Sequence, residues 1–170
     1  MNVVLLVDGY NIIGAWPELR EAKERNLELA RDLLLEKMAE YQAFTGSKVI
    51  VIFDAHMVEG IGKKYQNYRV DVIYTKENET ADERIEKLVI ELKRVDTQIY
   101  VATSDFVEQS VTFGRGALRK SARELRIELE IAEKGIKNSV EKTQKKQPST
   151  KIPLTKEMAE LFEKWRRGDR

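Results

Sequence analysis

The sequence predicts an α/β protein built on a mostly parallel sheet, and three observations lead to this fold class. Short apolar, β-branched runs alternate with longer segments whose apolar residues follow helical spacing. The chain has 170 residues, which is the usual length of one domain. Hydrophobic residues make up 42% of it, enough to fill a core. Strands that alternate with helices in this way run parallel and are joined by right-handed crossovers.

Four apolar runs are predicted to be the strands of this sheet. Residues 3–7 and 49–53 are continuously apolar, a pattern typical of strands that are covered on both faces. The runs at 70–74 and 99–102 are expected to be the third and fourth strands. Residues 59–68 carry several glycine and lysine residues and are expected to form a loop.

Helices are expected between these strands. In residues 27–44 the apolar residues follow helical spacing, and Gly46 is expected to end the helix. The helix at 80–93 begins with a capping box, in which Thr80 and Glu83 each accept a backbone N–H of the other. A short helix is expected after the fourth strand.

The last third of the chain is predicted to form a long helix followed by a short one. From residue 116 to about 140, apolar residues recur every three or four positions and form one stripe. Residues 143–153 are polar and contain proline, which is typical of a linker. We therefore expect a main domain over 1–142, a linker over 143–153, and a short helix over 154–170 that docks on the same domain.

The composition excludes several classes of protein. The chain has no cysteine, so it has no disulfide scaffold, thiolate metal site or cysteine nucleophile. No apolar run approaches the ~20 residues of a membrane span. The N-terminal strand has no basic region before it and is not a signal peptide. We expect a cytoplasmic protein with no membrane partner.

The charges are distributed unevenly along the chain. Residues 1–114 contain 14 Lys/Arg and 20 Asp/Glu, whereas residues 115–170 contain 16 Lys/Arg and 9 Asp/Glu. An acidic body beside a basic segment suggests a polyanion bound next to an acidic site. A solvated basic tail is the alternative interpretation.

Four aspartates are predicted to meet at one edge of the sheet. Asp8 and Asp54 directly follow the first and second strands, and Asp105 lies three residues after the fourth. Asp82 is in the first turn of the helix that follows the third strand. Ligands bind at this carboxyl edge in open α/β sheets. Each aspartate also has a structural interpretation, as a turn residue, a strand end or a helix cap.

A bound divalent cation would explain why four acids lie together at this edge. Carboxylates that share one crevice resist ionising together unless a cation neutralises them. Oxygen ligands in a chain without cysteine and with a single histidine favour Mg²⁺ or Mn²⁺ over zinc. Such a site suits phosphodiester hydrolysis, and Asn11 could orient Asp8 or a metal-bound water. His56 is the single histidine, so a ribonuclease mechanism that uses a pair of histidines is excluded. A histidine in such a position is more often a loop residue than a substrate contact.

The chain resembles the NYN-domain nucleases of the PIN-like superfamily, and within them the small bacterial YacP-like proteins, which are described as ribosome-associated mRNA endonucleases. Five motifs carry the resemblance, in the right order and over nearly the whole chain. They lie at residues 8–17, 53–55, 75–85, 102–105 and 114–124.

The resemblance implies a PIN-like three-layer fold and a metal-dependent endoribonuclease that acts on mRNA in association with the ribosome. It implies that Asp8, Asp82 and Asp105 are metal-site acids and that Asn11 accompanies them. Asp54 matches a more variable position of the family, although the strand pattern makes it a further candidate ligand. Mg²⁺ or Mn²⁺ is the expected cofactor, and no organic cofactor is expected.

The basic segment is then the candidate RNA-binding surface. Phosphate contacts by Lys and Arg supply much of the affinity for nucleic acids. We expect Arg115, Arg119, Lys120 and Arg123 to lie on the long helix and flank the acidic site. A solvated helix face is the alternative. Stacking on unpaired bases has four aromatic candidates, none of them preferred, namely Tyr10, Trp16, Tyr65 and Tyr68.

Two other functions compete with a nuclease. The domain could bind RNA or the ribosome without cutting it, but acids at four strand ends argue against this. It could also be a phosphoryl-accepting α/β domain, such as a receiver or an aspartyl phosphatase. Those domains place a second acid beside the first, whereas Asp8 is followed by Gly9, Tyr10 and Asn11.

Overall fold

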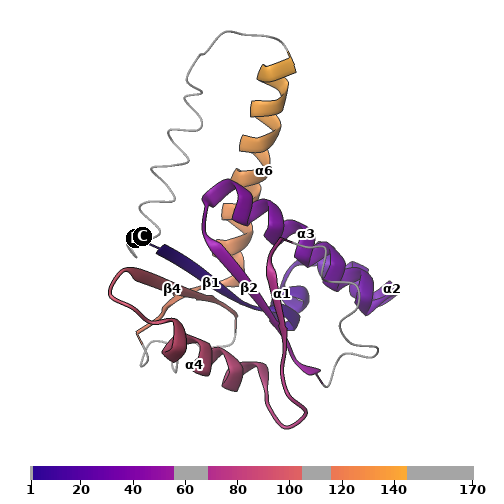
Figure 1. The fold of residues 1–170 in the computed structure, drawn as a ribbon. Coiled ribbons are helices and arrows are strands. Elements are labelled where there is room, and N and C mark those ends of the chain that lie inside the picture. Colours follow the sequence, from indigo (N-terminus) through magenta and orange to yellow (C-terminus); the bar gives the residue numbers. More distant parts are fainter. Residues whose placement is uncertain (1, 56–68, 105–115, 145–170) are drawn as a thin grey trace.

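A five-stranded parallel sheet forms the centre of the molecule (Figure 1). The computed structural model describes residues 2–55, 69–104 and 116–144. The strands lie in the order β3-β2-β1-β4-β5. Their bounds are β1 Asn2–Asp8, β2 Lys48–Phe53, β3 Asp71–Tyr74, β4 Thr97–Ala102 and β5 Leu118–Lys120. The predicted α/β class with a parallel sheet is confirmed.

Helices cover both faces of the sheet and make a three-layer structure. Within the described residues they are α1 Gly9–Ala15, α2 Pro17–Arg25, α3 Leu27–Thr45, α4 Ala81–Leu92 and α6 Ala122–Gln144. The helix α4 packs on one face, and the other helices supply the buried residues of the opposite face (Figure 1). None of the described helices combines the length and the apolar character needed to cross a membrane.

The alternation of side chains along the strands explains the two cores. Leu5 and Val7 of β1 pack with the helices α1, α2, α3 and α6. Val4 and Leu6, which alternate with Leu5 and Val7 along the strand, pack against α4. Successive strand residues point to opposite faces, so a continuous apolar run is required wherever both faces are covered.

The predicted helix boundaries are close to the observed ones. Gly46 ends α3 in the left-handed conformation, with φ of 74°, which glycine adopts without strain. The capping box of α4 is present, because the Thr80 side chain accepts from the Glu83 backbone and the Glu83 side chain accepts from the Thr80 backbone.

Two short helices between β1 and α3 are not expected from the sequence. The helix α1 starts at Gly9, directly after β1, and Pro17 opens α2 at the position where proline is favoured in a helix. A β-carbon at Gly9 would overlap the Phe53 ring. Glycine at this position therefore lets α1 begin close to the end of β2.

The prediction of one helix starting at residue 116 is wrong. Leu118 to Lys120 form β5, which pairs in parallel with β4 so that Ala102 lies opposite Lys120. The helix α6 begins only at Ala122. Three residues are too few to distinguish a strand period from a helical one, and pairing with β4 decides the outcome.

The expected basic character of the long helix is not confirmed. Five Lys/Arg residues of α6 are balanced by five Asp/Glu residues within the same bounds. The positive excess of the last third of the chain therefore comes from residues on either side of α6. The expected short helix over 154–170 and most of the expected linker lie outside the described residues.

Candidate functional site

The carboxyl ends of β1 and β4 form the natural binding position of this sheet. The chain passes from β1 to β2 on one side, and later to β4 on the other side of β1. Ligands of open α/β sheets bind where the strand order reverses in this way. Asp8 is the last residue of β1, and Val7 lies opposite Ala102 of β4. Asp8 and Thr103 are therefore neighbours at this position.

Asp8 is a buried carboxylate that a buried hydroxyl contacts. Only 8% of Asp8 is exposed, and Thr103 is fully buried. The Thr103 Oγ1 atom donates to Asp8 Oδ2 over 3.4 Å. The Thr103 backbone N–H in turn donates to the Lys120 carbonyl oxygen at 3.1 Å. Sequence reasoning misses Thr103, although its place directly after a buried strand is a usable signal.

Asn11 joins the first turns of α1 to the residues after β4. Its Oδ1 atom accepts from the Ser104 backbone N–H at 2.6 Å and from Ser104 Oγ at 2.9 Å. Asn11 is therefore at the predicted site. It binds Ser104, whereas the sequence suggests that it orients Asp8 or a water.

Asp54 and Asp82 also lie at the carboxyl edge of the sheet. Asp54 directly follows β2, and Asp82 lies in the first turn of α4, after β3. The connection between β3 and α4 is tied to the sheet, because the Thr75 backbone N–H donates to the Phe53 carbonyl and the Thr75 hydroxyl accepts from the Ala55 N–H at 2.9 Å. Asp82 is thus positioned by a well-bonded connection.

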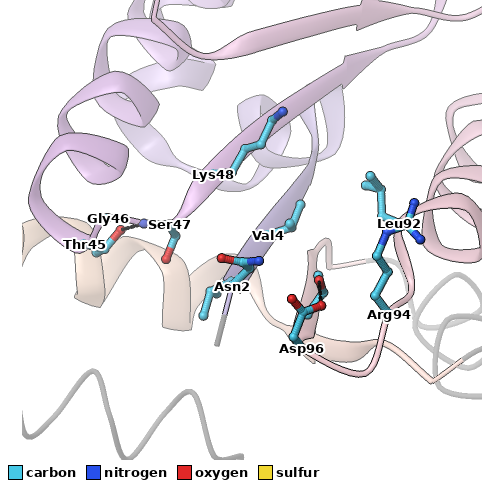
Figure 2. A pocket seen from close by; sticks show the side chains of 11 residues that line it. Asn2, Val4, Thr45, Gly46, Ser47, Lys48, Leu92, Arg94 and Asp96 are labelled. Atoms are coloured by element: carbon cyan, nitrogen blue, oxygen red, sulfur yellow. Dashed lines mark hydrogen bonds between the residues drawn. The ribbon is translucent and has the colours of Figure 1, made fainter.

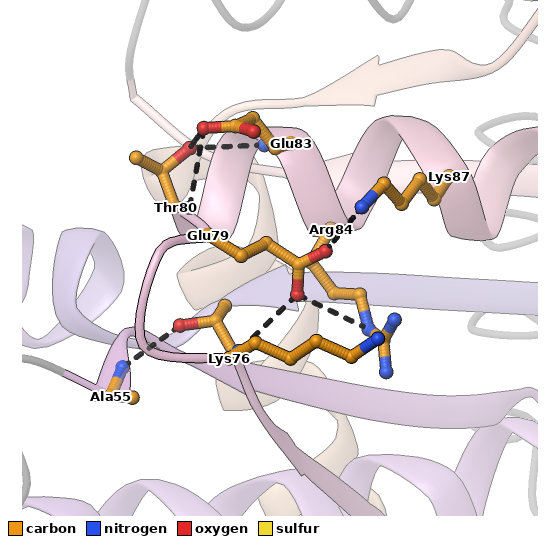
Figure 3. A network of polar contacts seen from close by, with 8 residues as sticks. Ala55, Lys76, Glu79, Thr80, Glu83, Arg84 and Lys87 are labelled. Atoms are coloured by element: carbon orange, nitrogen blue, oxygen red, sulfur yellow. Dashed lines mark hydrogen bonds and ion pairs between the residues drawn. The ribbon is translucent and has the colours of Figure 1, made fainter.

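A buried carboxylate completes that connection. Glu79 is only 4% exposed, and Lys87 donates to its Oε2 atom at 2.6 Å. The Lys76 backbone N–H and the Arg84 side chain approach the other oxygen, Oε1 (Figure 3). The hydrogen bond from Lys87 is the main reason why the pKa of Glu79 lies below its usual value. The start of α4 is consequently anchored by charge as well as by its capping box.

The described residues do not by themselves form a metal site. Across 2–55, 69–104 and 116–144, no three Asp, Glu or His side chains are grouped closely enough to hold a metal ion. Asp8, Asp54 and Asp82 share an edge of the sheet, but these three described acids do not form such a group. Asp105, the fourth predicted acid, lies outside the described residues. The donor type fits a hard cation, and the four-acid site stays a prediction.

Lys120 is not a surface cation, and its burial overturns the prediction that it binds RNA. It is 4% exposed, and its Nζ atom donates to both oxygens of the buried Glu128 at 2.7 and 2.6 Å. The Tyr41 hydroxyl donates to the same carboxylate at 2.6 Å, and the ammonium lies 4.7 Å from the centre of the Tyr100 ring. Lys120 points into the core because neighbouring strand residues face opposite sides.

The other predicted RNA contacts do not form one row along a helix. Arg119 is half-buried on β5, whereas Arg123 is exposed in the first turn of α6. Arg126, the next cation of this segment, is paired with Glu18 at 3.0 Å. Arg115 lies outside the described residues. Arg123 is therefore the exposed, described member of the predicted set.

Of the aromatic candidates for base stacking, Trp16 is a core residue. It is 1% exposed, and its Nε1 atom donates to the Ala122 carbonyl oxygen at 2.9 Å. Tyr10 is half-buried, with its ring centre 5.0 Å from that of Phe53, and its hydroxyl accepts from Arg31 at 3.1 Å. The other two candidates, Tyr65 and Tyr68, lie outside the described residues, as does His56.

A cavity of about 400 Å³ lies at the opposite edge of the sheet (Figure 2). It is lined by the amino ends of β1, β2 and β4 and by the ends of α3 and α4. Lys48, Arg94 and Asp96 are among the residues around it (Figure 2). None of the predicted site residues that the structure describes lines it, so it is separate from that part of the candidate site.

Comparison with known proteins places this arrangement in a family. The model of the YacP-like NYN domain matches residues 5–167. A Bacillus subtilis (strain 168) protein called "Uncharacterized protein YacP" is 60% identical over 166 residues, which cover 98% of each chain. The crystal structure of Rae1 (YacP) from Bacillus subtilis matches with a TM-score of 0.78 and 59% identity, over 97% of this chain and 95% of that one. A mutant form of Rae1 matches with a TM-score of 0.74 and 55% identity, over 97% and 96% of the two chains.

Proposed function

The chain belongs to the YacP-like NYN domain family, and we propose that it is a metal-dependent endoribonuclease that cuts mRNA in association with the ribosome. NYN domains are PIN-like nuclease domains, and this membership indicates a nuclease. The finer statements, namely RNA as substrate, a metal cofactor, the ribosome as partner and a cytoplasmic location, belong to the proposal.

The buried Asp8 carboxylate at the strand-order reversal carries the proposal. The Thr103 hydroxyl donates to it over 3.4 Å, so a residue that follows β4 helps to hold the carboxylate at the end of β1. An acid held at the place where open α/β sheets bind their ligands is suited to a cation that also approaches the substrate.

Asp8, Asp54, Asp82 and Asp105 would hold Mg²⁺ or Mn²⁺. The bound cation would lower the pKa of a water molecule and neutralise charge on the scissile phosphate. The protein contributes the position of the acids. Thr103 fixes Asp8 from β4, and the bonded connection after β3 fixes Asp82.

RNA affinity is proposed to come from Arg123, with Arg119 and Arg115. Arg123 is exposed at the start of α6, and α6 begins where β5 ends at the carboxyl edge. It therefore lies at the same edge of the sheet as Asp8. A phosphodiester backbone bound by this residue would run along the edge that carries the acids.

The test is cleavage of an end-labelled RNA by the purified protein, with Mn²⁺ or with chelator, and with Asp8→Asn as the matched variant. We expect cleavage by the wild type only with metal, a loss of several orders of magnitude in the variant, and products with 5′-phosphate and 3′-hydroxyl ends. Products with 2′,3′-cyclic phosphate would contradict attack by a metal-activated water.

The same experiment separates the nuclease from a binding module. A wild type that binds RNA or ribosomes but leaves both intact with Mg²⁺ and with Mn²⁺ would favour the non-catalytic alternative. In that case Asp8→Asn should not alter binding.

A further inference from the structure

The hydrogen-bond donors of Ser104 determine the orientation of the Asn11 side-chain amide. A backbone N–H can only donate, so the atom of Asn11 that lies 2.6 Å from the Ser104 nitrogen must be the oxygen Oδ1. The same oxygen lies 2.9 Å from Ser104 Oγ. Exchanging the oxygen and nitrogen of the amide would set two donors against each other.

These two hydrogen bonds leave Asn11 poorly suited to bind a cation. Asparagine binds hard cations through its carbonyl oxygen. This oxygen has two lone pairs, and two hydrogen bonds already use them in this structure. A cation on Asn11 would have to displace Ser104.

The contact joins distant parts of the chain at the strand-order reversal. Asn11 and Ser104 are 93 positions apart, and the neighbouring contact between Asp8 and Thr103 spans 95. Thr103 and Ser104 are consecutive residues after β4. Thr103 contacts Asp8, which directly precedes α1, and Ser104 contacts Asn11, which lies in the first turn of α1. The Thr103 backbone is further tied to β5 through the Lys120 carbonyl. The two contacts together form a clamp between the start of α1 and the end of β4.

We propose that Asn11 is a positioning residue that holds this clamp closed and is not a metal ligand. By fixing Ser104 it fixes the preceding residue, Thr103, so that the Thr103 hydroxyl stays within reach of the Asp8 carboxylate. The effect on the reaction rests on the proposed nuclease function, whereas the clamp itself does not.

Three variants test this assignment. Asn11→Ala removes both hydrogen bonds, and Asn11→Asp keeps an oxygen that can accept from Ser104. Asn26→Ala is the matched control, because Asn26 Oδ1 also accepts from a backbone N–H, that of Glu28 at 2.8 Å, but at the start of α3.

The first measurement is independent of activity. In chelator, the Ser104 amide should exchange with solvent about tenfold faster in Asn11→Ala than in wild type, because a hydrogen bond of ordinary strength has been removed. Asn11→Asp and Asn26→Ala should retain the wild-type protection. Unchanged exchange in Asn11→Ala would overturn the clamp, whatever the enzyme does.

The second measurement concerns metal and catalysis. Asn11→Ala should keep most of the Mn²⁺-induced rise in Tm but lose about 10- to 100-fold in kcat with little change in KM, since misplacement of a catalytic group mainly affects the chemical step. Asn11→Asp should recover part of that loss, and Asn26→Ala should not lose activity. Loss of the Mn²⁺-induced rise in Asn11→Ala would make Asn11 a ligand and overturn the proposal. A wild type that neither cuts RNA nor responds to Mn²⁺ would refute the proposed function and leave the exchange result to decide the clamp.

Discussion

Asp8 is placed by the sheet at the end of β1, and its charge is proposed to bind metal. A structural role and a metal-binding role of Asp8 can be distinguished experimentally. If several acids repel one another in the absence of metal, Asp8→Asn removes part of that repulsion. We expect the variant to melt in chelator at the wild-type temperature or slightly above it. In millimolar Mn²⁺ it should lose most of the metal-induced gain, which for the wild type is about 2.7 kcal/mol at a hundredfold excess over Kd. Thermal melting in chelator and in Mn²⁺ measures both quantities.

The opposite pattern would assign Asp8 a structural role. In that case Asp8→Asn melts well below wild type in chelator, because the Thr103 hydroxyl contact is weakened. It then shows the same response to Mn²⁺ as the wild type and still cuts RNA.

Lys120 stabilises the core because its ammonium group pairs with the buried Glu128 carboxylate. Burial raises the pKa of Glu128, and the Lys120 ammonium and the Tyr41 hydroxyl oppose that rise. Removing one partner of a buried pair is costly because the other charge is left uncompensated. Lys120→Met should therefore lower the free energy of unfolding by about 3–5 kcal/mol at neutral pH. The double variant Lys120→Met/Glu128→Gln should recover much of this, since glutamine can still accept from Tyr41. Denaturant unfolding of the full double-mutant cycle measures the coupling.

The pH dependence of Lys120→Met gives a check on the same network. Without Lys120 the pKa of Glu128 should lie still higher in the folded state. A carboxyl whose folded pKa exceeds its unfolded pKa destabilises the protein as pH rises between the two values. The cost of Lys120→Met should therefore be smallest in acid and grow as the pH rises above the folded pKa of Glu128 in the wild type, which already lies above the ordinary value. A cost that does not vary with pH would mean that Glu128 is not the affected group.

At the scale of elements, α1 depends on a glycine for its approach to β2. Gly9→Ala should destabilise the fold by about 1–3 kcal/mol, because the added methyl group would overlap the Phe53 ring. Gly14, in the same helix, has open space around it. Gly14→Ala should stabilise the protein by about 0.4–1 kcal/mol through a less flexible unfolded chain. Chemical denaturation of both variants tests the contrast, and equal effects would show that the start of α1 adapts.

The connection between β3 and α4 should weaken in acid. The pKa of Glu79 is lowered in the folded state by Lys87, so the unfolded state binds more protons as the pH falls. Glu79 thus stabilises the protein above the ordinary pKa of about 4.3, and this contribution is lost as pH falls towards its lower folded pKa. The stability difference between wild type and Glu79→Gln should be largest at neutral pH and shrink below about pH 4.3.

Urea unfolding across this pH range makes the measurement. Glu91→Gln, on an exposed part of the same helix, controls for the loss of a carboxylate and should stay within about 0.5 kcal/mol of wild type. A Glu79→Gln curve parallel to wild type would contradict the anchoring role of Glu79.

The elements that the sequence predicts well are those with strong local signals. Continuous apolar runs locate β1 and β2, and the Thr80 capping box and Gly46 locate helix ends to within a residue or two. The strand β5 escapes prediction because its three residues fit a helical stripe, and only pairing with β4 makes them a strand. The helices α1 and α2 carry too few apolar residues in a row to be recognised by period.

At the scale of the whole molecule, the order and direction of the strands determine where most of the candidate site residues lie. The parallel direction of the strands is enough, by itself, to predict that Asp8, Asp54 and Asp82 share one edge. The contacts of Asn11 with Ser104 and of Lys120 with Glu128 cannot be predicted in the same way. The first joins residues 93 positions apart. The second depends on which side of β5 faces the core, and no local pattern specifies that side.

The charge distribution of the molecule leads to the last prediction. If RNA lies along the carboxyl edge, Arg123 contacts phosphate, whereas Arg94, at the cavity on the amino edge, does not. Both arginines are exposed, so neither change should greatly affect folding. Arg123→Ala should weaken binding of single-stranded RNA in chelator and reduce the slope of log K against log salt by roughly 0.7, the value for one lost phosphate contact. Arg94→Ala should leave both quantities unchanged, and fluorescence titrations at several salt concentrations measure them. If the two variants behave alike, RNA does not follow the carboxyl edge, and Arg123 is solvated surface.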